Sequence, residues 1–130
     1  MISGINGIIE SKGDGWLDVN VGGVTLHISI PVSLSFHLAP VGKKTKLFTQ
    51  FILKNEDPQL YGFADQASLR VFQLLTGVSG IGPKTALQVL SSKTPQDIAT
   101  GIVSGDTSMF TSISGIGRKV ANRIILELQP

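Results

Sequence analysis

Val78-Ser-Gly-Ile-Gly-Pro-Lys-Thr-Ala-Leu-Gln-Val-Leu90 returns later in the chain as Ile113-Ser-Gly-Ile-Gly-Arg-Lys-Val-Ala-Asn-Arg-Ile-Ile125. The two copies match at one constant offset, which pairs Gly80 with Gly115, Gly82 with Gly117, Lys84 with Lys119 and Ala86 with Ala121. Each copy places two glycines before a helix and a lysine in its first turn. The chain therefore contains a tandem structural repeat.

The glycine turns of the repeat predict an anion-binding site. Glycine adopts positive φ readily, so such a turn can fold tightly and aim several N–H groups outward. The helix N-terminus adds partial positive charge and the lysine adds a full charge. A single turn of this kind would more often be a plain helix cap. Two copies in register can hold two phosphates of one polyanion, which indicates binding to a nucleic-acid backbone.

The residues expected to contact phosphates belong to both copies. Ile81 and Ile116 are the structural part, since each is an apolar plug that pins its turn to the domain. Arg123 lies one helical turn beyond Lys119, so it can extend the basic patch. The predicted DNA-binding residues are Gly80, Gly82, Lys84, Gly115, Gly117, Arg118, Lys119 and Arg123.

Helix boundaries in residues 64–130 follow from local signals. Asp65 is a good N-cap for a helix that ends near Gly77, and Pro83 suits the first position of the next helix. Thr94 is expected to cap a third helix, Asp106 opens a short one, and Gly117 precedes the last. Helix, glycine hairpin and helix, repeated after a connector, predict a tandem helix-hairpin-helix domain.

Residues 1–63 have the period of strands. Val24 to Ile30 alternates strictly, and Gly22-Gly23 predicts a two-residue hairpin turn before it. One or two helical turns are expected from Val32 to Leu38, then a strand from Thr45 to Lys54, a turn over Asn55 to Pro58, and a last strand to Phe63. Five strands with a helix between the third and fourth predict an OB-fold barrel. The fold class is α+β, with strands first and helices second.

Composition argues against a disordered, a membrane-spanning or a secreted protein. With 130 residues and 42% hydrophobic content the chain can form one domain or two small ones. It has no cysteine, no apolar run of membrane-spanning length and no signal peptide, so a cytoplasmic protein without disulfides is expected. The net charge of +2 arises entirely in residues 64–130, because residues 1–63 carry five basic and five acidic side chains.

No catalytic, metal or cofactor site is predicted. Gly77 to Thr85 nearly spells a nucleotide-binding P-loop, but Pro83 separates glycine from lysine and removes one amide. Glu56 and Asp57 fall at a hairpin tip, where they are either a solvated turn or a pair of carboxylates that repels a DNA backbone. Aromatic residues of the first half could stack on bases, although packing is favoured: Trp16, Phe48, Phe51, Tyr61 and Phe63.

Taken together, these motifs resemble the RuvA family of Holliday-junction-binding subunits, through the whole chain and in order. The matching stretches are Met1-Ile2, Val21-Gly-Gly-Val24, Phe48-Thr-Gln-Phe51, Leu60-Tyr-Gly-Phe63, Gly80-Ile-Gly-Pro-Lys84 and Gly115-Ile-Gly-Arg-Lys119. The resemblance implies an OB-fold that forms a homotetramer, a domain that grips duplex arms, and an acidic pin at the junction centre, here Glu56-Asp57. It also implies a bacterial, nucleoid-associated protein that carries the ATPase RuvB, with the resolvase RuvC as a further partner.

Two departures accompany the resemblance. Asn55 precedes the acidic pair, which shifts the pin by one position. The family continues into a linker and a third domain that binds the ATPase, whereas this chain ends at Gln129-Pro130. We therefore expect junction binding without recruitment of the motor. Two alternatives remain from other classes: the DNA clamp of a repair nuclease, which needs a carboxylate cluster, and a single-strand or RNA binder built on the barrel.

Overall fold

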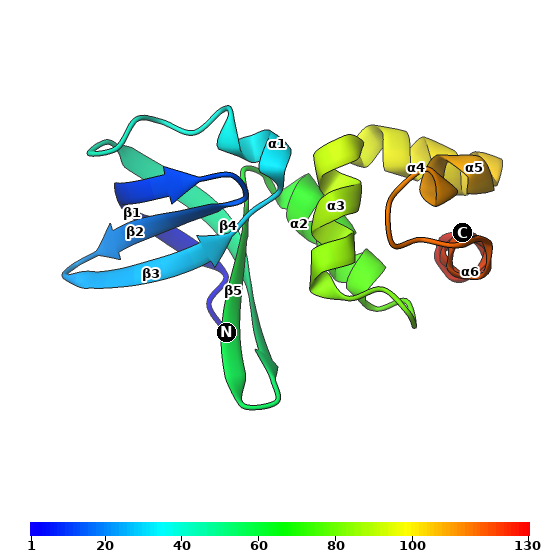
Figure 1. Cartoon of the computed structure of the whole chain (residues 1–130), viewed down its shortest axis with the longest axis horizontal. Helices are drawn as coiled ribbons and strands as arrows, with labels where there is room; N and C mark the ends of the chain where they lie inside the picture. Colours follow the sequence, from blue (N-terminus) through cyan, green and yellow to red (C-terminus); the bar gives the residue numbers. More distant parts are fainter. The chain divides into compact units, whose positions relative to one another are not determined.

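Five strands close into a barrel in the first part of the computed structural model, which describes all residues from 1 to 130. The chain divides into two compact units, Met1–Leu69 and Arg70–Pro130. The barrel elements, shown in Figure 1, are β1 (Gly4–Gly13), β2 (Trp16–Val21), β3 (Val24–Ser29), α1 (Val32–Ser35), β4 (Lys44–Lys54) and β5 (Asp57–Phe63). The strand order is β1-β2-β3-β5-β4, and only β3 and β5 pair in parallel. The five-stranded barrel predicted from the strand periods is confirmed.

The barrel is filled by apolar side chains that alternate along its strands. Val24, Leu26 and Ile28 share a face of β3, but Val24 is 58% exposed and only Ile28 is fully buried. The core therefore begins further along this strand than the alternation indicated. Gly62 lets β5 approach closely, since a Cβ there would lie 2.8 Å from Cγ2 of Ile28. The core residues are Ile5, Ile9, Leu17, Val19, Ile28, Ile30, Leu47 and Leu60.

The β4–β5 hairpin extends beyond the rest of the barrel, as Figure 1 shows. Pairing between β1 and β4 stops at Phe48, whereas β5 pairs with β4 as far as Lys54. The predicted turn over Asn55 to Pro58 is too long, because β5 already begins at Asp57 and Pro58 pairs with Leu53. A proline is tolerated there because the two-stranded arm has no third strand that needs its N–H.

Five helices follow the barrel: α2 (Gln66–Thr76), α3 (Pro83–Ser92), α4 (Pro95–Ser104), α5 (Thr107–Thr111) and α6 (Arg118–Leu128). Three of their N-termini are capped as predicted. Asp65, Thr94 and Asp106 accept hydrogen bonds from the amides of Ser68, Asp97 and Met109, respectively. None of the helices could span a membrane, since the longest, α2 and α6, have 11 residues each.

The helical unit has its own apolar core, to which both copies of the repeat contribute at matching positions. The hairpin plugs Ile81 and Ile116 are 6% and 4% exposed, which confirms that they are buried. The matching helix positions Ala86 and Ala121 are fully buried. The sequence repeat is therefore a repeat of packing as well as of composition.

Candidate nucleic-acid interface

The two glycine turns adopt the same backbone conformation. The amide of Ile81 donates to the carbonyl of Val78 at 3.0 Å, and the amide of Ile116 donates to the carbonyl of Ile113 at 3.1 Å. The first glycine of each turn has positive φ, 95° at Gly80 and 92° at Gly115. A residue with a Cβ would be strained at these positions. Each turn therefore requires its first glycine for conformational reasons.

The helices that follow the turns start without a side-chain cap. Gly82 precedes α3 and Gly117 precedes α6, and neither N-terminus has a side-chain cap hydrogen bond. The other three helices of this part of the chain are capped by Asp65, Thr94 and Asp106. The first-turn amides of α6, and those of α3 after Pro83, which has no N–H, are thus left for an external acceptor at the positive end of each helix dipole.

The second glycine of each turn has no structural reason to be a glycine. Gly82 and Gly117 have extended backbones, with φ of −91° and −87°. A Cβ at either position would meet no protein atom within 4 Å. An alanine would therefore fit without strain or clash. The open space at both positions allows a ligand to approach the backbone closely.

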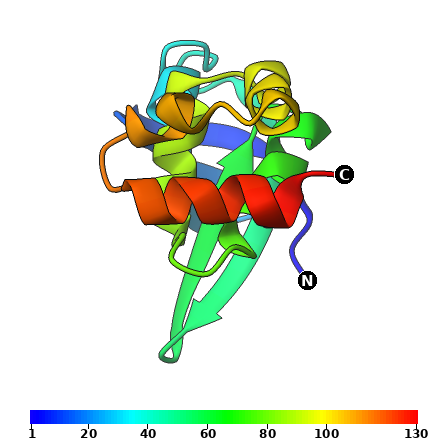
Figure 2. The same cartoon turned by 90° about the vertical axis from the view of Figure 1, so that its right-hand side faces the viewer.

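Each turn packs against the helix of the other copy. A Cβ at Gly80 would lie 3.3 Å from Val120 and 3.5 Å from Arg123 on α6, and one at Gly115 would lie 3.6 Å from Thr85 and 3.8 Å from Gln88 on α3. Thr85 matches Val120 and Gln88 matches Arg123 at the constant offset of the repeat. The two copies are therefore related by an approximate two-fold axis. In Figure 2, α6 is drawn in red.

Arg123 breaks this symmetry. Its Nη1 donates a hydrogen bond to the carbonyl oxygen of Ser79 at 2.8 Å, so it reaches the first turn and does not simply extend a patch along α6. Gln88, the matching residue of α3, has no such bond to the second turn. Thr85 and Gln88 were not among the predicted site residues, although the same offset that aligns the glycines assigns both to the turn contacts.

The remaining predicted basic residues are solvent-facing. Lys84, Arg118 and Lys119 are exposed, and each lies in the first turn of an uncapped helix. The one contact between a basic and an acidic side chain within 4 Å joins His27 to Asp18, so none of these three residues has a carboxylate partner. Their charges are available to an anion at the turns.

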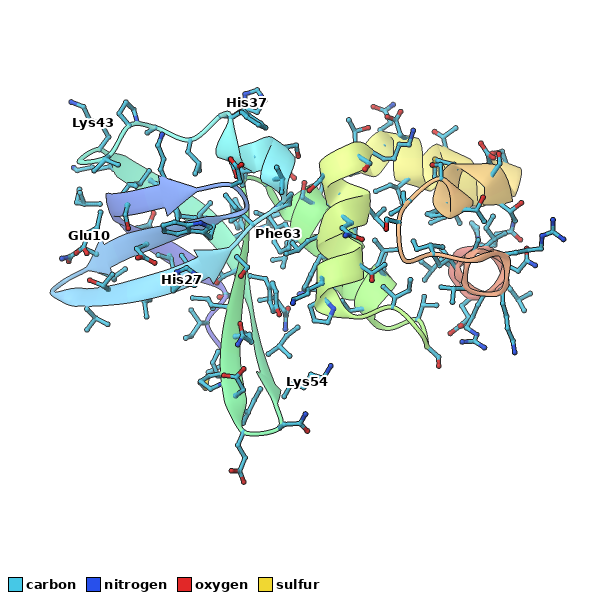
Figure 3. The ribbon with its side chains drawn as sticks, viewed as in Figure 1. Glu10, His27, His37, Lys43, Lys54 and Phe63 are labelled. Carbon is cyan, nitrogen blue, oxygen red and sulfur yellow. The ribbon has the colours of Figure 1, made fainter.

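The acidic hairpin tip differs by one residue from the prediction. Asn55 and Glu56 form the turn, with φ of 51° and 63°. Asp57 is instead the first residue of β5, where its Oδ2 accepts a hydrogen bond from Nε2 of Gln59 at 2.7 Å. Lys54, the last residue of β4, is labelled near this end of the arm in Figure 3.

Burial and the negative charge of Asp57, in that order, raise the pKa of the Tyr61 phenol. Tyr61 and Phe63 are 8% and 0% exposed, so neither offers a face to a base.

His27 is exposed and contacts Asp18 at 2.6 Å. No group of three or more His, Cys, Asp or Glu side chains is placed to hold a metal ion.

The chain thus belongs to the class of proteins in which a closed five-stranded barrel precedes a tandem helix-hairpin-helix unit. The two motifs of that unit pack against each other. Comparison with protein families agrees for both parts. Residues 1–62 match the RuvA N-terminal domain, and residues 72–130 match the SAM-like helix-hairpin-helix tandem.

Curated relatives match nearly the whole chain. It is 44% identical to a protein of Chloroflexus aurantiacus and 38% identical to one of Dehalococcoides mccartyi, over 99% of this chain and 66% of each relative. A protein of Methylibium petroleiphilum is 34% identical, over 67% of its length. All three are named Holliday junction branch migration complex subunit RuvA. The chain belongs to the RuvA family and spans about two thirds of the length of these relatives.

Proposed function

We propose that the chain binds four-way DNA junctions as the DNA-targeting subunit of a branch-migration complex. The relatives' names associate the family with Holliday junctions. The observation that carries the proposal is the pair of uncapped, glycine-led helix N-termini, each with an exposed lysine and open space at its second glycine. Such sites bind phosphates through backbone amides and charge, without reading bases.

The residues that contact DNA in this proposal come from both copies of the repeat. The amides around the paired glycines hold phosphate oxygens, and Lys84, Arg118 and Lys119 add charge. Arg123 hydrogen-bonds Ser79 and has further guanidinium donors, so it serves the first turn from the second copy. The glycines involved are Gly80, Gly82, Gly115 and Gly117.

We assign the preference for junctions over a continuous duplex to the acidic tip of the β4–β5 hairpin. Glu56 has a φ of 63°, a region that a residue with a Cβ adopts at a cost, and glycine is the preferred residue in such two-residue turns. A strained, exposed carboxylate at the end of a projecting arm is better explained by function than by stability. Glu56, together with Asp57, repels phosphates and so disfavours a continuous duplex at the junction centre.

We further propose that four copies of the chain assemble around one junction. A junction has four arms, and one chain with two phosphate sites grips about one of them. A cyclic homotetramer places four equal grips around one axis, where the acidic tips meet. The chain itself performs no catalysis in this account, and ATP hydrolysis belongs to a RuvB partner; RuvC is a second candidate partner at the same junction.

One experiment separates this function from its alternatives. Four-way junction, plain duplex and single-strand probes are titrated with the chain, and light scattering gives the mass of each complex. We expect the chain to bind the four-way junction more tightly than the other probes. The mass of that complex should correspond to four copies of the chain or a multiple of four. Tightest binding to single strands would favour the barrel as a single-strand site. Magnesium-dependent cleavage would favour a nuclease, for which the structure offers no cluster of three ligands.

A further inference from the structure

Three lysines gather at the start of β4, in the barrel unit and outside the helical repeat: Lys43, Lys44 and Lys46. All three are exposed. Beside them the outer wall of the barrel has a shallow hollow, lined by Asn6, Gly7, Ile8, Lys44, Thr45 and Lys46. The barrel segment has no net charge, so this is a local concentration of positive charge and not part of a general basic surface.

The register of β1 and β4 places two of these lysines on one face. Lys44 pairs with Ile8 and Lys46 pairs with Asn6. Residues two apart on a strand point to the same side and lie about 7 Å apart. Lys43 immediately precedes them, and its carbonyl accepts a hydrogen bond from the amide of Ile9, which ties the loop to β1.

No carboxylate neutralises this cluster. Glu10 is the nearest acidic residue on β1, but it is engaged on the other side, where it accepts hydrogen bonds from Asn20 at 2.6 Å and Thr25 at 3.0 Å. None of the three lysines forms an ion pair. The acidic tip lies at the other end of the same strand, and Figure 3 shows Lys43 and Lys54 at opposite ends of the barrel unit.

We propose that this cluster is a second DNA contact, which binds the phosphate backbone of duplex DNA. Lysines are strongly hydrated point charges that suit phosphates without selecting a sequence. No aromatic residue lines the hollow, and the neighbouring ring of Phe48 has Nζ of Lys46 over one of its faces, 5.4 Å from its centroid. The cluster is thus suited to a duplex better than to a single strand.

An anionic lipid surface is a weaker fit. Stable attachment to a bilayer needs buried apolar area together with basic charge. Ile8, 37% exposed, is the only large apolar side chain that lines the hollow.

The proposed contact lies in a different unit from the glycine turns and does not depend on them. DNA binding can therefore be disproved at one site and still hold at the other.

Lysine acetylation of the full chain, read by mass spectrometry with and without duplex or junction DNA, tests the contact directly. We expect DNA to protect Lys43, Lys44 and Lys46, while Lys12 and Lys93 stay reactive. Protection of Lys84 and Lys119 alone would overturn this inference and leave the proposed function intact. Protection of the β4 cluster alone would support the inference and count against the glycine turns.

A charge-matched pair of variants supplies the energetic test. Lys43→Gln/Lys44→Gln/Lys46→Gln should flatten the slope of log affinity against log salt by up to about 2.7 per bound chain. Lys12→Gln/Arg70→Gln/Lys93→Gln changes the net charge equally at other positions and should leave the slope unchanged. Equal slopes for the two variants would overturn the proposal. So would protection of the cluster by phosphatidylserine vesicles but not by DNA.

Discussion

Arg123 donates a hydrogen bond from Nη1 to the carbonyl oxygen of Ser79 at 2.8 Å, so a side chain of the second copy holds the turn of the first. The two residues are far apart in sequence, and the bond joins the two motifs at the edge of the proposed phosphate site. Gln88, the matching residue of the first copy, makes no such bond, so we expect the first turn to be held more firmly than the second.

Arg123→Lys should loosen the first turn while it keeps the positive charge. We expect faster amide hydrogen exchange at residues 79–81 and a loss of about 1 kcal/mol from the free energy of unfolding, as for one partly exposed hydrogen bond. The second turn should exchange as before. Gln88→Ala is the control, because it truncates the matching residue without breaking such a bond. Unchanged exchange at residues 79–81 in Arg123→Lys would show that the bond does not hold the turn.

Alanine at the two kinds of glycine should have opposite consequences. Gly82→Ala and Gly117→Ala should leave stability unchanged or raise it by about 0.5 kcal/mol, because an extended backbone accepts alanine without strain. Both should weaken DNA binding, since a methyl group then occupies the open space beside the amides. Gly80→Ala and Gly115→Ala should instead cost about 1–2 kcal/mol of stability, owing to their positive φ.

Chemical denaturation and junction titration of all four variants check this prediction. Full DNA affinity in Gly82→Ala and Gly117→Ala would show that no ligand approaches these positions. Destabilisation by these two substitutions would contradict the geometry of the turns.

Glu56→Gly should stabilise the fold and reduce its selectivity. Glycine adopts the φ of 63° at this position without strain, so the free energy of unfolding should rise by about 1 kcal/mol. Junction preference over duplex should fall, because a charge at the arm tip is lost. Glu56→Gln keeps the strain and removes the charge, so it should lose selectivity without gaining stability. Equal stability of the two variants would contradict the strain at Glu56.

Titration of Tyr61 reports on the charge of Asp57. Burial and Asp57 hold the phenol pKa above 10.0, so the neutral phenol stabilises the folded state. This contribution is fully present below pH 10.0 and is lost as the pH rises through the raised pKa. Asp57→Asn should lower the pKa of Tyr61, whereas Glu56→Gln should change it less.

Phenolate absorbance measures this pKa cleanly, because the chain has one tyrosine. Identical titration curves for Asp57→Asn and the unsubstituted chain would show that Asp57 does not act on Tyr61.

Local signals in the sequence predicted most of the fold. Asp65, Thr94 and Asp106 cap helices within three residues of themselves, so neighbouring residues suffice to place those helices. The alternation of β3 gave the correct face, but it could not show that Val24 lies beyond the barrel core, since that depends on where the barrel closes. The tip at Asn55-Glu56 was misplaced because Pro58 is a common turn residue, and only pairing with Leu53 assigns it to β5.

The residues of the candidate site were predictable from the sequence, but the contacts between them were not. The constant offset identified the glycines and lysines of both turns. The bond between Arg123 and Ser79 could not be inferred, because it requires the relative orientation of two helices. That orientation is set by core packing in the helical unit, which no short sequence motif records.

The salt dependence of junction binding shows whether the two glycine turns and their lysines hold phosphates. Lys84→Gln/Lys119→Gln is compared with Lys12→Gln/Lys93→Gln, which changes the net charge equally outside the turns, and both are checked for unchanged unfolding. We expect the slope of log affinity against log salt to fall by about 1.8 per bound chain in the first variant and to stay constant in the second. A folded Lys84→Gln/Lys119→Gln variant with the slope and affinity of the unsubstituted chain would contradict it.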